Sequence, residues 1–170
     1  MHEIAYAVRG FLTVRRNSLR VPLSGSLAVR ADLESGLFTG DLDLRQSAIS
    51  RTVLGASLFS ATVEITAESP VIGSVDREGQ MVATVTVDAV LSAVRAAGRT
   101  LISGSSCRTA THATVPLRSK PGFDFEQGGR LVGGYYRPPF TGCGWITPLV
   151  NLLAAGPGNA VVIDLIPRTR

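Results

Sequence analysis

Aromatic side chains are scarce in this chain, which has one Trp, three Tyr and six Phe among 170 residues. Because 45% of the residues are nevertheless hydrophobic, Val, Leu, Ile and Ala must form most of the core. Charged residues make up 18%, and this balance excludes the highly charged, weakly apolar composition of disordered chains. The length predicts a single domain over residues 1–170 that buries roughly two-thirds of its unfolded surface.

Long apolar runs are also absent, because no segment approaches the ~20 apolar residues of a membrane helix. We therefore expect no membrane-spanning segment. Residues 1–10 carry neither the basic region nor the small-residue cleavage site of a secretory signal. Two locations stay open: the cytoplasm, or the exterior and cell envelope if the chain is a mature form that carries a start methionine.

Lysine is almost missing, since Lys120 is the only one among 17 basic residues and the other 16 are Arg. Arginine suits phosphate or carboxylate binding, but a GC-rich genome explains the same bias without a binding site, and we favour that explanation. The arginines form no cluster beyond Arg15 and Arg16, and no aromatic ladder accompanies them. We therefore expect no nucleic-acid partner.

A hydrophobic period of two runs through most of the chain and is typical of antiparallel strands with one apolar and one wet face. Four runs show it most clearly, with the expected inward residues Leu27, Val29, Ala31 and Leu33; Phe38, Gly40, Leu42 and Leu44; Phe59, Ala61, Val63, Ile65 and Ala67; Met81, Ala83, Val85 and Val87. Further strands are expected at 4–14, at 19–23 leading into the second strand, and at 160–166. Turn sequences at 34–36, 76–79, 120–122 and 127–129 separate the runs, so the strands should form a meander.

Residues 89–97 fit two structures, because their alanine-rich sequence also matches one face of a helix. We favour a strand through Leu91, since the alternation runs unbroken from Met81. The sequence thus predicts an all-β, mainly antiparallel fold of about nine or ten strands with one short C-terminal helix. Its curled meander sheet forms a barrel, a half-barrel or a sandwich.

The one helix is expected over 148–155, with Thr147 as N-cap and Pro148 at the first helical position. Leu149, Val150, Leu152 and Leu153 give it a short apolar face, and Gly156 should end it.

The two cysteines, Cys107 and Cys143, lie 36 positions apart and in no metal-binding pattern. We favour a disulfide over two buried free thiols, because Cys143 precedes the predicted helix and a bridge would tie that helix to the sheet. Such a bridge stabilises by about 3–4 kcal/mol in the chain-entropy model. It would also favour an exported protein.

Catalytic motifs are not evident, and we predict no catalytic residue, no metal site and no cofactor. No G-x-S-x-G sequence is present, and His112, the only plausible base, is expected to be exposed or hydrogen-bonded. Asp41 and Asp43 share the wet face of one strand and lack a calcium loop, so we expect them to be solvated.

Residues 140–144, 147–153 and 156–159, which include the sequences FTGCG, TPLVNLL and GPGN, resemble a group of exported, β-rich actinobacterial proteins of unknown function. Residues 38–42 and Cys107 resemble further features of that group. The resemblance implies export and a disulfide but no activity, and the missing signal sequence departs from it. More loosely, the Phe-x-Gly strand pattern is similar to that of the YceI-like lipid-binding barrels.

We expect a non-enzymatic protein that holds a lipid or other apolar small molecule inside the curled sheet, because small and aliphatic inward residues leave room for a cavity. The helix would close one end. The expected ligand-binding residues are Phe38, Phe59, Tyr135, Tyr136 and Trp145. The alternative is a structural or interaction module of the cell envelope, with a filled sandwich core and either a second copy or an envelope protein as partner.

Overall fold

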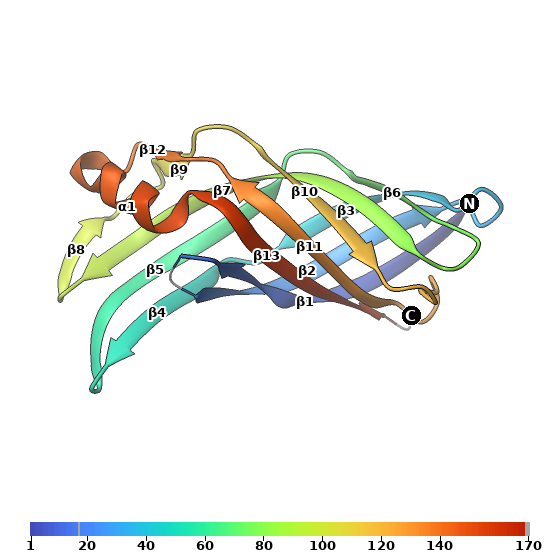
Figure 1. The fold of residues 1–170 in the computed structure, drawn as a ribbon, viewed down its shortest axis with the longest axis horizontal. Coiled ribbons are helices and arrows are strands. Elements are labelled where there is room, and N and C mark those ends of the chain that lie inside the picture. Colours follow the sequence, from blue (N-terminus) through green and yellow to red (C-terminus); the bar gives the residue numbers. More distant parts are fainter. Residues whose placement is uncertain (17, 169–170) are drawn as a thin grey trace.

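The protein folds into an elongated antiparallel β-barrel with one helix at one end (Figure 1). The structure is a computed structural model that describes residues 1–16 and 18–168, except for the side chains at 53 and 57. The elements of the described chain are β1 (His2–Val14), β2 (Leu19–Ala31), β3 (Leu37–Leu44), β4 (Ser47–Val53), β5 (Ala56–Ala67), β6 (Val71–Val75), β7 (Met81–Ala96), β8 (Arg99–Ile102), β9 (Cys107–Thr109), β10 (Ala113–Ser119), β11 (Gly129–Arg137), β12 (Phe140–Thr141), the 3-10 turn η1 (Gly144–Ile146), α1 (Thr147–Ala154) and β13 (Gly156–Pro167).

Eight strands close the barrel. The hydrogen-bonded order runs β10-β11-β13-β1-β2-β3-β6-β7, and β7 returns to pair with β10. All of these pairings are antiparallel. The expected all-β, curled sheet is thus confirmed, and of the three predicted forms the chain adopts the barrel, because the sheet closes on itself and keeps one side-chain face inside.

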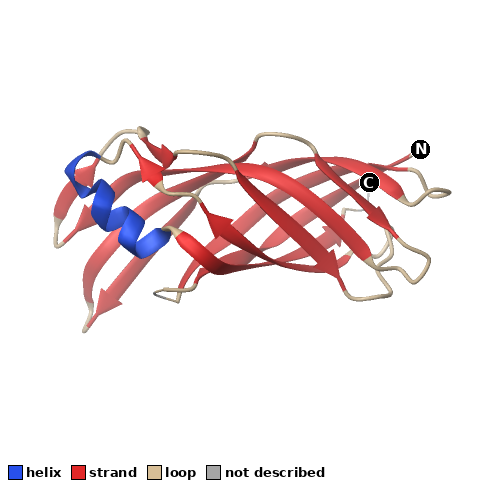
Figure 2. Cartoon of the chain, turned by 45° about the horizontal axis from the view of Figure 1, so that its top comes forward, coloured by secondary structure: helices blue, strands red, loops and turns tan. Residues whose placement is uncertain are grey.

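Strand β7 belongs to two parts of the wall, because it is 16 residues long. Its first half pairs with β6 and β10 inside the closed ring. Its second half pairs with β5, β8 and β9, so that β4, β5 and β8 extend the wall beyond the ring at the end where α1 lies (Figures 1 and 2). The two ends of the barrel are therefore built differently.

The predictions are confirmed for the long strands, whereas the short strands were not predicted. Ten strands form the continuous order of the sheet, and three more, β8, β9 and β12, contain four, three and two residues. Such short strands show no alternation that a sequence can reveal. The uncertain segment 89–97 is strand as far as Ala96, whereas Leu33, expected to face inward, lies in the β2–β3 turn and is exposed.

Aromatic side chains fill the end opposite α1, near both chain termini. Phe125 packs edge-to-face against Phe38 and Phe123, with ring centroids 5.8 and 5.9 Å apart. The fully buried Tyr6 hydroxyl donates a hydrogen bond to the backbone carbonyl of Phe125. This end of the barrel is therefore a packed plug.

Glycine permits the tight turn at this plugged end. Gly36 has φ +72°, and a Cβ there would lie 2.2 Å from the carbonyl oxygen of Val75. Only glycine avoids both the left-handed strain and the clash, so the turn predicted at 34–36 forms as expected.

The helix forms where the sequence predicts it, with different ends. Thr147 is its first residue and not its N-cap: the Thr147 hydroxyl donates to the carbonyl of Gly144 in η1, 2.8 Å away, and makes no cap hydrogen bond. The helix ends at Ala154, and Ala155 is already extended, so Gly156 begins β13 and does not cap the helix. The extended backbone of Ala155 therefore ends the helix and leads the chain into β13.

Candidate ligand-binding cavity

Three cavities lie in a row inside the barrel and shrink away from α1. Their volumes are about 240, 50 and 20 Å³. The first and second cavities share Arg137 in their walls. The second and third share four residues, namely Leu42, Val85, Leu117 and Ile163. The interior therefore narrows from the α1 end toward the aromatic plug.

The largest of these three cavities has an apolar wall built by β1, β2, β4, β5, β7, β8, β11, η1 and α1. Fifteen of its 17 lining residues are apolar, and the other two are Arg51 and Arg137. Period-two alternation creates this wall, because every second residue of each strand faces inward, as Val63 of β5 and Leu91 of β7 do. No acidic side chain lines any of the three cavities.

Helix α1 covers the wide end without being packed into it. Leu149, Val150, Leu153 and Ala154 line the large cavity, yet no side chain of the helix is buried. Leu149 stays 51% exposed and Leu153 45% exposed. Because full burial of a leucine stabilises by about 1.5–3 kcal/mol, this apolar face has unused capacity for contact with another apolar molecule.

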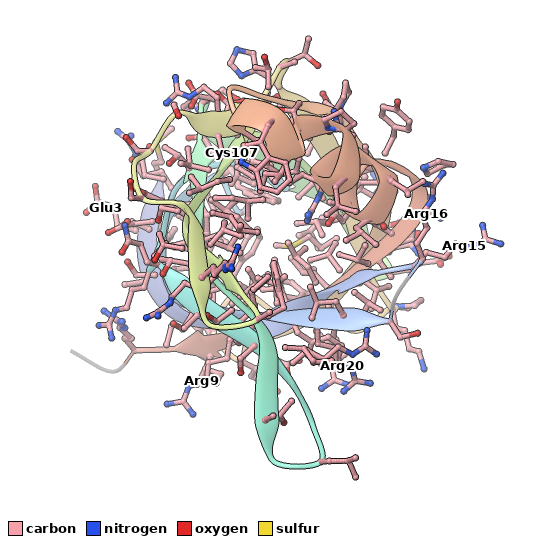
Figure 3. All side chains as sticks on the ribbon, turned by 90° about the vertical axis from the view of Figure 1, so that its left-hand side faces the viewer. Glu3, Arg9, Arg15, Arg16, Arg20 and Cys107 are labelled. Atoms are coloured by element: carbon pink, nitrogen blue, oxygen red, sulfur yellow. A yellow bond between two sulfur atoms is a disulfide. The ribbon has the colours of Figure 1, made fainter. Side chains whose placement is uncertain are left out.

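Covalent and hydrogen-bonded links hold the helix at this position. Cys107 of β9 and Cys143, just before η1, form a disulfide that joins Cα atoms 4.3 Å apart, which confirms the predicted bridge. The side chain of Asn151 accepts a hydrogen bond from the backbone N–H of Phe140 at 2.6 Å and donates one to the carbonyl of Phe140 at 3.0 Å. Figure 3 looks into this end of the barrel, with α1 and Cys107 on one side and the β4–β5 hairpin projecting on the other.

Arg137 and Tyr135 form a buried polar pair within this apolar interior. The Nη2 atom of Arg137 donates to the Tyr135 hydroxyl at 2.8 Å, and the guanidinium carbon lies 5.7 Å from the centroid of the Tyr135 ring. Tyr135 lines the second cavity, and Arg137 lines both the first and the second. Both residues face inward because they stand two positions apart on β11.

Arg137 is not among the residues predicted from the sequence to bind a ligand. The pattern of β11 holds the signal, since Leu131 and Tyr135 mark the odd positions as inward and Arg137 continues them. A charged residue just before Pro138 and Pro139 indicates instead an exposed strand end, and for this reason the burial of Arg137 was not predicted.

The residues predicted to bind ligand lie at different places. Phe59 lines the largest cavity, Tyr135 the second and Phe38 the smallest, within the aromatic plug. Tyr136 faces the exterior, and Trp145 in η1 is 80% exposed; neither lines any of the three cavities. Ligand binding by these residues stays a prediction.

Polar clusters outside the barrel are exposed. His112 is hydrogen-bonded as expected, with its Nδ1 atom 2.7 Å from Oδ1 of Asp88. Glu68 brings its carboxylate into the same group, in which the three possible ligand atoms lie within 4.8 Å of one another. No local sequence pattern indicates this group, because Glu68 directly follows β5, Asp88 lies within β7 and His112 directly precedes β10. Asp41 lies on the surface and pairs with Arg30 at 3.5 Å.

Comparison of the chain with protein-family models, with curated proteins and with solved structures found no match. The part of the chain that the structure describes contains no helix with both the length and the apolar character needed to cross a membrane. The disulfide is compatible with an extracytoplasmic location. Fold and interior together define the protein as an antiparallel β-barrel with an apolar cavity beneath a helical cover.

Proposed function

We propose that the protein is a non-enzymatic carrier that holds a lipid or another long apolar molecule in the wide end of its barrel, outside the cytoplasm or in the cell envelope. The observation that carries this proposal is the apolar cavity of about 240 Å³ beneath a helix with no buried side chain. An apolar cavity of about 150 Å³ is large enough to bind benzene, and small-molecule pockets span about 300–1,000 Å³. The cavity exceeds the first volume and approaches the second range, and the wall formed by α1, which has no buried side chain, is the part that an outward shift would enlarge.

The exterior of the same end supports the proposal. Exposed apolar side chains are found on the β4–β5 hairpin and on η1 and α1, and they include Leu54, Leu58, Trp145 and Leu152. A molecule that enters or leaves the cavity meets this apolar rim before it meets bulk water. The likeness to exported actinobacterial proteins bears on location and implies no activity, whereas the looser likeness to YceI-like barrels agrees with lipid binding. Both likenesses stay predictions.

The test is a pair of matched valine substitutions. Val63→Phe places a larger side chain inside the large cavity, whereas Val82→Phe adds the same bulk to the outer face of β7. We expect wild type and Val82→Phe to bind a fluorescent fatty acid, cis-parinaric acid, with equal affinity. Val63→Phe should weaken this binding by about tenfold or more, because the larger side chain fills the space that the hydrocarbon chain of the fatty acid would occupy.

Native mass spectrometry of the purified protein before and after solvent extraction provides a second measurement. We expect an additional mass that organic solvent removes. Absence of a bound molecule, together with no cis-parinaric acid binding to wild type, contradicts the carrier. In that case a symmetric dimer or a bound protein partner at the apolar rim would support the alternative, an interaction module of the envelope.

A further inference from the structure

Arg137 carries a charge at a place where the described part of the chain supplies no opposite charge. Its side chain is only 6% exposed, and the ion pairs of the described residues involve Arg30, Arg130 and His112 instead. An arginine stays protonated in proteins, so it cannot escape burial by losing its proton. Among the described residues no side-chain nitrogen or oxygen is both fully enclosed and unpaired, so the free N–H groups of Arg137 face the cavity, where an anion can accept hydrogen bonds from them.

The hydrogen-bonding capacity of the pair is largely unused. A guanidinium has five N–H donors, and among the described residues Arg137 uses one of them, toward the hydroxyl of Tyr135. That hydroxyl accepts from Arg137 and keeps its own proton for donation. Two kinds of donor, one of them cationic, therefore meet where the large cavity joins the second.

The shape of the interior indicates how a ligand would lie. On the inner side of Arg137 the second cavity offers about 50 Å³, room for a few water molecules, since one water needs about 10–15 Å³ of such space, and far less than the large cavity offers. On the outer side the apolar cavity of about 240 Å³ extends to α1. A small anionic head group fits at the junction, and its hydrocarbon tail fits beneath the helix.

We propose that Arg137 and Tyr135 bind the carboxylate of a long-chain fatty acid whose hydrocarbon tail occupies the cavity covered by α1. A carboxylate matches the planar fork of one guanidinium, with two parallel N–H···O hydrogen bonds. This inference rests on the proposed carrier function and names its ligand class. The ligand enters head first, so its carboxylate lies deep and its methyl end lies at the rim.

The test compares palmitic acid, hexadecanol and hexadecyl phosphate as competitors of cis-parinaric acid. Arg137→Met replaces the cation with an apolar side chain of similar length, a change that buried charges often tolerate without loss of stability. We expect Arg137→Met to bind palmitate about 10- to 100-fold more weakly, the range for loss of charge-assisted hydrogen bonds, and hexadecanol within about threefold of wild type. Tyr135→Phe should weaken palmitate binding several-fold, and Arg137→Lys should restore part of the loss caused by Arg137→Met.

The matched control is Arg130→Met, which removes an exposed arginine from the outer face of β11 and should leave palmitate binding unchanged. Equal palmitate affinity in wild type and Arg137→Met, or a larger loss in Arg51→Met, overturns the assignment. Tighter binding of hexadecyl phosphate than of palmitate overturns the choice of carboxylate. If wild type binds neither palmitate nor hexadecanol, the carrier function itself fails, whereas binding of both with no dependence on Arg137 removes only this inference.

Discussion

Tyr6 and Arg137 show at the residue scale how the packed end of the barrel differs from the end that contains the large cavity. Tyr6 is fully buried at the plugged end, and its hydroxyl donates to a backbone carbonyl there. Arg137 is buried beside a cavity, and most of its donors have no protein partner. The Tyr6 hydroxyl thus has its hydrogen-bond partner within the plug, whereas most N–H groups of Arg137 face the cavity without a protein partner.

The stability of the plug should depend on pH through Tyr6. Burial raises the pKa of this phenol, and the nearby carboxylate of Asp124 raises it further. Because the folded state holds the phenol proton more tightly than the unfolded state, this contribution is complete below about pH 10 and is lost as pH rises above it. We expect the free energy of unfolding, measured in urea, to decline in that alkaline range.

Tyr6→Phe should lower the free energy of unfolding near neutral pH by about 1 kcal/mol, because it removes one hydrogen bond, and should remove the part of the alkaline decline due to Tyr6. The exposed Tyr136 supplies the matched control, so Tyr136→Phe should follow wild type. Identical alkaline profiles for Tyr6→Phe and wild type would refute the role assigned to the Tyr6 phenol.

Among the elements, α1 depends most on its connections, since it has no buried side chain. The disulfide joins residues 36 positions apart and therefore restricts the unfolded chain substantially. We expect reduction to lower the free energy of unfolding by about 4 kcal/mol in the chain-entropy model. Urea unfolding with and without reductant measures this difference, and intact mass should rise by two hydrogens on reduction.

A Cys107→Ala/Cys143→Ala variant serves as the comparison for the reduced protein. Both sulfur atoms are buried, so the variant should be somewhat less stable than reduced wild type because it also loses packing. Equal stability of oxidised and reduced wild type would show that the bridge contributes nothing to the fold.

The long strands were predictable and the interior position of Arg137 was not, for one physical reason. Strand alternation is a local property, so the apolar faces of β2, β3, β5 and β7 are visible in the sequence. Whether a curled sheet closes depends on pairing between β7 and β10, which two other strands, β8 and β9, separate along the chain. Arg137 becomes an interior residue only once that closure exists, and its charge and the prolines that follow it indicate an exposed strand end, against the alternation of β11 that marks its position as inward.

At the scale of the whole molecule, the hollow end should be less stable than the plugged end. Regions with few buried apolar contacts open more readily, and hydrogen exchange reports such opening. We expect backbone amides of α1, β4 and β8 to exchange faster than those of β1 and β2 around Tyr6. Mass spectrometry of deuterated peptides measures this difference.

Palmitate should slow exchange at the hollow end and leave the plugged end almost unchanged. A ligand present at 100 times its Kd stabilises the protein that binds it by about 2.7 kcal/mol. Val63→Phe is the control, because a filled cavity should show slow exchange at α1 without ligand and no further change with it. Uniform protection of both ends by palmitate would contradict a ligand held beneath the helix.

Strand β13 lies beside β1, from the other end of the described chain: Tyr6 stands opposite Pro167 in the seam between them. A ribosome or a translocation channel releases residues in order, so β1 lacks its second neighbour until β13 has emerged. The ring therefore cannot close before the 12 residues of β13 are available, and a polypeptide that lacks β13 leaves β1 and β11 as unpaired edges open to association with other chains.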